Sequence, residues 1–338
     1  MPAHSRPTIV DVADRAGVSK STVSLVLRRE PNVSEKSRQA VLEAVAALGY
    51  RPNAVARSLV QQRSYVVGVL LSDLHNPFFT ALIDGISAAA EEFDYRALFN
   101  TGNRTSSGEA VAIETMLQLR VDGLILAGTV IDEATVDEIA ADTNLVLASR
   151  RSTSELADSV ATDDLTGARL AVDHLVGLGH RRIAHVTGGG GAGAAARCDG
   201  FLASMAAHGL EGREAMVAEG SYTEAGGIAG MEEVLAGAEA PSAVFVANDL
   251  AAIGALRVLA EAGMRVPDDM SVIGYDDTYL AAFEHIDLTS VHQDTFEMGR
   301  TAVRLLLDRT DSGRTTPRHL TLEPRLTVRG STGPPYRS

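Results

Sequence analysis

Polar and aromatic side chains follow several short apolar runs of this 338-residue chain, at the points where buried strands would end. Carboxylates, amides and guanidinium groups can hydrogen-bond the hydroxyls of a polyol, and adjacent aromatic rings can stack on its apolar face. Any one of these residues alone is more often a helix cap or part of a surface loop. The set comprises Ser72, Asp73, Asn76, Phe78, Phe79, Arg150, Asn248, Asp276 and Gln293. Because each lies near a predicted strand end, together they predict a binding site for a small polar molecule.

A second group of hydrogen-bonding side chains lies near the start of the chain, on one predicted helix that follows Ser19. Ser, Thr, Lys and Arg can reach the phosphates and base edges of DNA. Leu25 is apolar in an otherwise polar outward row, and a thymine methyl would be a suitable partner for it. The group comprises Lys20, Ser21, Thr22, Ser24, Leu25 and Arg28. It predicts a DNA-contacting helix, although any three-helix bundle shows similar periodicity.

Two series of short apolar, β-branched runs position the strand-end residues. Continuous apolar runs are typical of strands buried in a parallel sheet. The first series is Tyr65–Leu71, Gly123–Leu126 and Leu145–Ala148, and the second is Arg182–Val186, Ala243–Val246 and Met270–Ile273. Helix-like stretches separate the runs, so the pattern predicts two doubly wound parallel-sheet α/β subdomains. Ligands of such sheets bind at the carboxyl ends of the strands.

Three short helices are predicted in residues 1–50. Thr8, Ser19 and Ser34 are residue types that cap helix N-termini, and Gly17 and Gly49 suit the left-handed residue that ends a helix. The residues predicted to face inward are Val12, Ala13, Val23, Val26, Leu27, Val41, Leu42, Val45 and Leu48. The first two helices, joined by a glycine-containing turn, form a helix-turn-helix pattern in which the second helix reads the major groove.

Charge is divided unequally along the chain, whose formal net charge is −14. Residues 1–63 carry ten basic and five acidic side chains, whereas residues 64–338 carry 20 basic and 39 acidic ones. A small basic head on a large acidic body is typical of a DNA-binding domain fused to a second domain. A stand-alone solute-binding protein would not need such a head.

Residues 51–63 join the head to the body. Pro52 suits the first turn of a helix, Asn53 can cap one, and the residues up to Leu59 favour helix. The segment is too short for an isolated helix to be stable in water. We therefore expect a hinge that is helical only when it is docked.

The first sixty residues resemble the headpiece of the lactose/galactose repressor family. The matching motifs are Thr8-Ile-Val-Asp-Val-Ala13, Ala16-Gly-Val-Ser19, Thr22-Val-Ser24, Pro31-Asn-Val-Ser34, Leu48-Gly-Tyr-Arg-Pro-Asn53 and Ala56-Arg-Ser-Leu59. The resemblance implies DNA contacts by Thr8, Ser19 and the helix that follows it. It also implies a hinge helix in the minor groove, with contacts from Asn53, Ala56, Arg57 and Leu59, the last as a wedge between base pairs. Leu25 and Arg28 depart from the family's usual residues, which leaves the operator sequence open.

The body resembles the sensor domain of the same family, which is similar to periplasmic sugar-binding proteins. By motif, the resemblance assigns Asn76, Phe78, Phe79, Arg150, Arg197, Asn248, Asp276 and Gln293 to the effector pocket. Many sugar-sensing members have Asp before the arginine of the fourth strand end, where this chain has Ser149. That departure weakens the case for any particular monosaccharide.

The expected architecture is a helix-turn-helix domain at 1–50, a hinge and linker at 51–63, and an effector-binding and dimerisation domain at 64–338. Subdomain one is expected at about 64–164 plus 293–324, and subdomain two at about 165–292 plus 325–333. The resemblance implies a homodimeric transcriptional repressor of a pseudo-palindromic double-stranded operator, controlled by a sugar-like effector. An activator, or a sensor of a purine-like ligand, would share this architecture.

Other functions have weaker support in the sequence. The run Gly188–Gly193 satisfies the dinucleotide-binding glycine pattern, but no acidic residue ends a following strand at the required distance, so a loop over the cleft is expected instead. No catalytic or metal-ligand spacing is present, so we expect neither an enzyme nor a cofactor nor a bound metal. The single Cys198 fits a reducing compartment. Without an apolar run for a signal peptide or a membrane span, we expect a cytoplasmic, nucleoid-associated protein.

Overall fold

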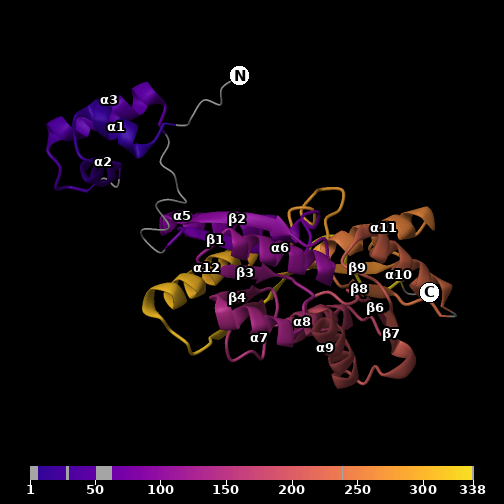
Figure 1. The fold of residues 1–338 in the computed structure, drawn as a ribbon. Coiled ribbons are helices and arrows are strands. Elements are labelled where there is room, and N and C mark those ends of the chain that lie inside the picture. Colours follow the sequence, from indigo (N-terminus) through magenta and orange to yellow (C-terminus); the bar gives the residue numbers. More distant parts are fainter. Residues whose placement is uncertain (1–6, 28–29, 51–62, 238, 337–338) are drawn as a thin grey trace. The chain divides into compact units, whose positions relative to one another are not determined.

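The computed structural model describes residues 7–27, 30–50, 63–237 and 239–336. Residues 51–62 of the predicted hinge lie outside this described part of the chain. The protein forms two compact units, Met1–Ser64 and Tyr65–Ser338, whose elements are labelled in Figure 1.

The described residues of the head unit form three helices, α1 (Ile9–Ala16), α2 (Lys20–Leu27) and α3 (Glu35–Leu48). The Thr8 hydroxyl accepts the Asp11 N–H at 3.4 Å, and the Asp11 carboxylate accepts the Thr8 N–H at 2.7 Å, which is a reciprocal cap at the start of α1. Gly17 and Gly49 end α1 and α3 with left-handed φ values of 65° and 59°. The predicted caps and stops of these two helices are therefore confirmed.

One predicted core position in the head is wrong. Val12, Val23, Val26 and Val41 are buried, but the Leu42 side chain is 48% exposed. Adjacent residues of an α-helix point about 100° apart, so Val41 and Leu42 cannot both face a core as narrow as this one.

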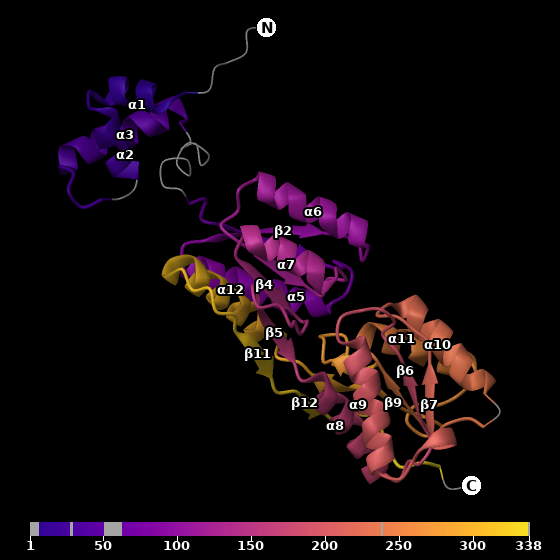
Figure 2. The same ribbon diagram turned by 60° about the horizontal axis from the view of Figure 1, so that its bottom comes forward.

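The body contains two six-stranded sheets, each with helices on both faces (Figure 2). The first sheet has the order β11-β5-β4-β3-β1-β2, and the second has the order β12-β10-β9-β8-β6-β7. The strands of the first are β1 (Val66–Leu71), β2 (Arg96–Thr101), β3 (Leu124–Ala127), β4 (Leu145–Ala148), β5 (Asp158–Thr162) and β11 (His319–Leu322). Those of the second are β6 (Ile183–Val186), β7 (Ala215–Ala218), β8 (Ala243–Val246), β9 (Ser271–Asp276), β10 (Thr289–His292) and β12 (Arg325–Thr327). Every pairing is parallel except the antiparallel β10–β12 pair.

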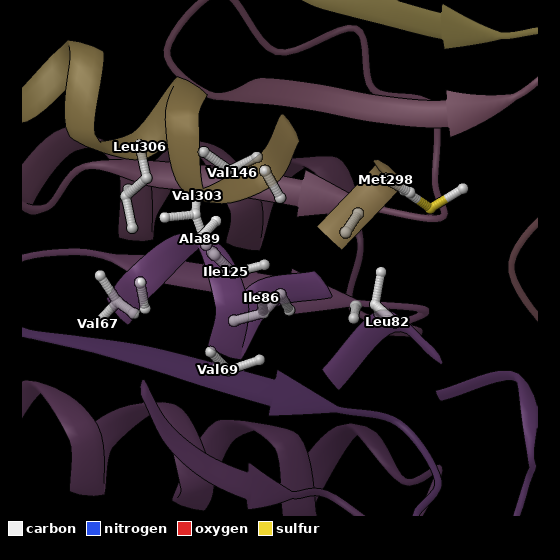
Figure 3. Close-up of a cluster of buried hydrophobic side chains, with 14 of the residues drawn as sticks. Val67, Val69, Leu82, Ile86, Ala89, Ile125, Val146, Met298, Val303 and Leu306 are labelled. Atoms are coloured by element: carbon white, nitrogen blue, oxygen red, sulfur yellow. The ribbon is translucent and has the colours of Figure 1, made fainter. Parts of the chain in front are cut away.

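Buried apolar clusters lie on both faces of each sheet. On the first sheet, one cluster joins the strands to α5 (Phe78–Glu92) and α12 (Thr295–Ser312), as Figure 3 shows, and the other joins them to α6 (Ser106–Gln118) and α7 (Glu133–Asp142). On the second sheet, the helices are α8 (Asp164–Gly177), α9 (Ala194–Ala207), α10 (Glu224–Ala236) and α11 (Asp249–Glu261), with a 3₁₀ turn at Gly212–Glu214. The predicted fold class, a helical head followed in the sequence by two doubly wound α/β subdomains, is confirmed.

The chain crosses between the two sheets three times, after β5, after β10 and after β11. The C-terminal part of the chain therefore contributes α12 and β11 to the first sheet and β12 to the second. Six strands were not predicted from the sequence: β2, β5, β7, β10, β11 and β12. They contain polar, exposed or only half-buried residues, so they lack the continuous apolar run used to find the others.

Candidate functional site

A cleft of about 520 Å³ lies in the body, between loops that follow strands of both sheets. Parallel strands of one sheet end at the same edge, so residues far apart in the sequence meet there. The cleft is lined by Ser72, Asp73, Asn76, Phe78, Phe79, Arg104, Gly128, Val130, Ser149, Gly188, Gly190, Gly191, Ala192, Arg197, Ser221, Tyr222, Thr223, Asn248 and Asp276. Eight of the ten residues predicted for a binding site are among them.

The first sheet supplies an aromatic wall. Phe78 and Phe79 begin α5, and their rings meet edge to face with centroids 5.1 Å apart. The Asn76 side-chain oxygen accepts the Phe78 N–H at 3.0 Å and so fixes the first turn of α5. Gly128 lies opposite with a left-handed φ of 65°, and a Cβ atom there would be 3.0 Å from the Phe79 ring. The rings and amide of this wall suit a molecule with one apolar face and a hydroxylated edge.

The second sheet supplies a buried cation. Arg197, on α9, is 4% exposed, and its Nε donates to Asp164 Oδ1 at 2.9 Å while its Nη1 donates to the Ala247 carbonyl at 2.7 Å. The guanidinium also lies over the Tyr275 ring, 3.7 Å from its centroid. The Tyr275 hydroxyl donates to the same Asp164 oxygen at 2.9 Å. These contacts hold Arg197 in one orientation at the cleft, which makes it a preorganised hydrogen-bond donor.

Asp276 ends β9 and faces the cleft beside this cation. Its Oδ1 is 3.8 Å from Arg197 Nη1, and burial raises the pKa of its carboxyl well above the usual range, a rise that the arginine opposes. Asp276 and the next residue, Asp277, have positive φ values of 105° and 52°, which are uncommon for residues other than glycine. Backbone strain of this kind occurs at binding sites where the surroundings enforce it.

Asp249 holds the strained turn in place from α11. Its Oδ2 accepts the Thr278 N–H at 2.6 Å, and its Oδ1 accepts the Ser290 hydroxyl at 2.6 Å. Burial raises the pKa of Asp249 to about 6. Asn248, directly before it, caps α11 by accepting the Ala251 N–H at 2.9 Å and also lines the cleft.

Asp73 and Arg104 form the charged part of the first side of the cleft. Arg104 Nη1 lies 3.6 Å from Asp73 Oδ2, and Asp73 Oδ1 accepts the His75 N–H at 2.9 Å. Arg104 has a left-handed φ of 58°, and its N–H donates to the Ser72 carbonyl at 2.9 Å. Arg104 was not predicted from the sequence, because it follows the half-buried strand β2 and belongs to no motif.

Tyr222 is a second lining residue that the sequence analysis missed, together with its neighbours Ser221 and Thr223. Its hydroxyl donates to the Ala192 carbonyl at 2.9 Å, and Cβ atoms at Gly188 or Gly191 would lie within 2.4 Å of its ring. The glycines thus leave room for the ring to pack against the loop after β6. The predicted glycine loop does line the cleft, and Tyr222 packs against it.

Two residues predicted for the pocket lie elsewhere. The Arg150 guanidinium binds the carbonyls of Thr129 and Ile131 and forms a 2.6 Å ion pair with Glu133, so it holds the loop after β3, and Ser149 lines the cleft in its place. Gln293 is buried behind the cleft, in contact with Asp276. For both, partners contributed by other segments turn the side chain away from the cavity.

In the head, the predicted DNA-contacting residues of α2 share one helix. Lys20 and Ser21 are exposed, and Thr22, Ser24 and Leu25 are half-buried. Ser19 accepts the Thr22 N–H at 3.1 Å, so it caps α2 as predicted, and Thr8 is exposed at the start of α1. The predicted contacts Arg28, Asn53, Ala56, Arg57 and Leu59 lie outside the described residues.

The described part of the chain was compared with what a metal site and a membrane span need. None of its His, Cys, Asp and Glu side chains gather in groups of three or more that could hold a metal ion. No helix in the described ranges is long and apolar enough to cross a membrane.

Two family models match the chain. Residues 8–53 match the model described as bacterial regulatory proteins, lacI family, and residues 172–332 match that of the periplasmic binding protein-like domain. The HTH-type transcriptional regulator CelR of Thermobifida fusca is 36% identical, over 98% of this chain and all of the relative. The ribose operon repressor of Escherichia coli (strain K12) is 33% identical, over 96% of this chain and 99% of the relative.

Solved structures resemble both units. The lac repressor dimer bound to operator and the anti-inducer ONPF has a TM-score of 0.86 at 30% identity, over 97% of this chain and all of that one. The complex of CelR with cellobiose has a TM-score of 0.73 at 34% identity, over 96% of this chain and all of that one.

Proposed function

The chain belongs to the lacI family of bacterial regulatory proteins, and on this premise we propose that it is a homodimeric transcriptional repressor whose operator affinity is set by a sugar or sugar derivative in the cleft. The protein is a DNA-binding regulator, not an enzyme. The observation that carries the effector proposal is the cleft itself, where an aromatic wall faces a preorganised arginine and a carboxylate. Such a set binds hydroxyl groups on one edge of a ring and the apolar ring face on the other.

The proposed mechanism couples this cleft to DNA through the first sheet and the hinge. Two heads place their α2 helices in adjacent major grooves, so the symmetry of a pseudo-palindromic operator matches that of the dimer. Effector binding changes how the two subdomains close, and this biases whether the hinges of the dimer can fold on DNA. A coupling of about 1–3 kcal/mol is typical for such a switch. We place the protein in the cytoplasm, where its DNA target lies.

A thermal-shift screen of the full chain against sugars and purines tests the effector class. Cellobiose and ribose are the first probes, since a neighbour is solved with cellobiose and a relative is named a ribose operon repressor. A bound ligand raises the unfolding temperature in a concentration-dependent way. If only purines shift the unfolding temperature, the proposed effector is a purine-like molecule and not a sugar. A transcription assay separates repressor from activator: increased transcription when the protein binds its operator would make it an activator.

The hinge is tested by Leu59→Ala. The residue corresponds to the predicted minor-groove wedge, so the variant should bind operator more weakly while its unfolding temperature and ligand-induced shift stay the same. Val111→Ala is the matched control, because Val111 is an exposed apolar residue of α6 in the body. Equal operator affinity of the two variants in a gel-shift titration would eliminate the wedge role.

A further inference from the structure

Gln293 lies at the second crossover, directly after β10, and is 2% exposed. Its side-chain oxygen accepts the Thr162 hydroxyl at 2.6 Å, and its side-chain nitrogen donates to Asp276 Oδ1 at 2.6 Å. Thr162 is the last residue of β5 in the first sheet, and Asp276 is the last residue of β9 in the second. One amide therefore bridges the two sheets behind the cleft.

The bridge lies where the crossovers are themselves joined. The Asp163 N–H donates to the Leu322 carbonyl at 3.0 Å, which ties the first crossover to the third. Gln293 belongs to the second crossover. Its two hydrogen bonds join that crossover to the first one and to Asp276, a carboxylate that lines the cleft. One side chain thereby connects Asp276 to the point at which β5 leaves the first sheet.

The chemistry of the bridge requires an amide. A carboxylate accepts only, so the group facing Asp276 must donate, while the group facing the Thr162 hydroxyl accepts. Glutamine does both at once, and its orientation is set by these two partners. Glutamate has the same shape, but when ionised it would place a second carboxylate against Asp276.

We propose that Gln293 is a positioning residue of the effector cleft, which holds the Asp276 carboxylate towards the ligand and links its position to the crossover at Thr162. This role rests on the proposed effector function of the cleft. A ligand hydroxyl that donates to Asp276 draws the carboxylate towards the cavity, and the amide carries that movement to β5. Gln293 thus acts on the ligand only through Asp276.

Other charges surround the Asp276 carboxyl and take part in its titration. Arg197 faces it from α9, Asp164 from α8 and Asp249 from α11. Wild-type Gln293 has no proton to exchange, so a new titration in a Gln293 variant arises from the substituted side chain and its contact with Asp276.

The first test is the pH profile of Gln293→Glu. When the pair of carboxyl groups holds one proton, a protonated Glu can donate to Asp276 and accept from Thr162, as the amide does. Burial and like charge raise the pair's pKa above its unfolded values, so the stability of the variant falls as pH rises from about 4 to the folded pKa. In that window its unfolding constant should rise relative to wild type, by up to about tenfold per pH unit.

Ligand affinity gives the second readout, with whichever of cellobiose and ribose shifts the wild-type unfolding temperature. The Gln293→Glu variant should bind that sugar about tenfold or more weakly at pH 8 and approach wild-type affinity at pH 5.5, because the proton restores the bridge. A residue needed only for packing would weaken binding equally at both pH values.

Thr162 separates positioning from coupling. Thr162→Val removes the hydroxyl but leaves the Gln293–Asp276 bond, so it should reduce the sugar's effect on operator affinity more than it reduces the sugar affinity. Thr162→Ser keeps the hydroxyl and should retain both. The same loss in Val and Ser variants, or no loss in either, would overturn the link to β5.

The outcomes separate the two proposals. If no sugar or purine binds the wild type, the effector function fails, yet the unfolding profile of Gln293→Glu still tests the Gln293–Asp276 bond. If a sugar binds and the Gln293→Glu profile runs parallel to wild type between pH 5 and 8, the positioning role is wrong and the effector function stands.

Discussion

Two buried ionic clusters lie near opposite ends of β5, and they differ in what their charges face. Asp158 begins the strand, is fully buried, and pairs with Arg314 at 2.6 Å and with Arg309 at 3.4 Å. Asp164 follows the other end of the strand and pairs with Arg197 at 2.9 Å. We refer to these as the Asp158 cluster and the Arg197 cluster. The first is surrounded by protein, whereas the second opens onto the cleft.

The difference lies in the surroundings of the carboxyl groups and in the direction in which these shift the pKa. Burial alone would raise the pKa of Asp158, but hydrogen bonds from the Arg314 side chain and the Arg318 N–H hold it below its usual value. Asp276, by contrast, has a raised pKa, because burial outweighs the arginine beside it. The Asp158 carboxylate is bonded only by its own chain and so holds α12 and β11 to the sheet, whereas the Asp276 carboxyl faces the cleft and can exchange bonds with a ligand. The following predictions test that contrast, from the largest expected effect to the smallest.

Asp158→Asn should be the most damaging change to stability. It leaves two guanidinium groups without their buried counter-charge, and breaking a buried pair costs about 3–5 kcal/mol. Urea unfolding followed by circular dichroism measures the loss. The control is Asp308→Asn, whose side chain is 40% exposed and pairs with Arg314 at 2.8 Å, and which should cost less than about 1 kcal/mol. Similar losses in both variants would refute the stabilising role of the buried Asp158 carboxylate.

Arg197→Ala should have its largest effect on the ligand response. It removes the guanidinium that lines the cleft and leaves Asp164 and Asp276 without their cation, so we expect sugar affinity to fall by about 100-fold or more, roughly 2.7 kcal/mol. Isothermal titration with a sugar found by the screen measures the affinity, and a gel shift should show operator binding retained.

Arg182→Ala is the matched control for Arg197→Ala, since its side chain is 46% exposed and pairs with Glu239 outside the cleft. It should bind the sugar as wild type does. A normal ligand response in Arg197→Ala would remove this residue from the site.

Asp277 should make the stability of the protein fall in acid. Burial would raise its pKa, but hydrogen bonds from His292, Arg329 and Thr327 lower it to about 2. Because the pKa of Asp277 is lower in the folded protein than in the unfolded chain, where it is about 3.9, the ionised group stabilises the fold at pH values above that. This contribution of about 2 kcal/mol disappears as the pH falls from about 5 to 2. Asp277→Asn, which tolerates the left-handed φ, should flatten the stability profile in this range. An unchanged slope would contradict the assignment.

Tyr222→Phe should have the smallest effect. The ring stays against the glycine loop, and only the hydroxyl bond to the Ala192 carbonyl is lost, at a cost of about 0.5–1.5 kcal/mol. Sugar affinity should fall by no more than about tenfold. A loss of affinity as large as that of Arg197→Ala would show that the Tyr222 hydroxyl itself contacts the ligand. The Arg197 cluster would then not be the main polar contact of the cleft.

Much of the fold could be predicted because its signals are local. The strands β1, β3, β4, β6 and β8 are short apolar runs buried along nearly their whole length, and such runs are recognisable without any partner. Strand β5 was missed because its signals are not local. It is fully buried, yet Asp158, Ser159 and Thr162 are polar, and their burial depends on Arg314, His319 and Gln293, all more than a hundred residues away.

The site was predictable to the extent that its residues follow strands. Asn76, Phe78, Phe79 and Asn248 lie in the segments that follow recognisable strands, and Asp276 ends one, so the parallel sheets bring them to one cleft. Tyr222 and Arg104 follow the half-buried strands β7 and β2, where no apolar run marks the position. They were missed because their approach to the cleft depends on the loops around them.

The sequence by itself determined the helix caps of the head, the uneven charge, the two series of strands and the family of the chain, because these depend on neighbouring residues and on composition. Only the tertiary structure decided which polar groups face the cavity. Arg150 and Arg197 are both arginines near strand ends, but Glu133 and two carbonyls hold the first away from the cleft, while Asp164 and Tyr275 hold the second beside it. Those partners come from other segments, and their geometry exists only once the sheets have formed.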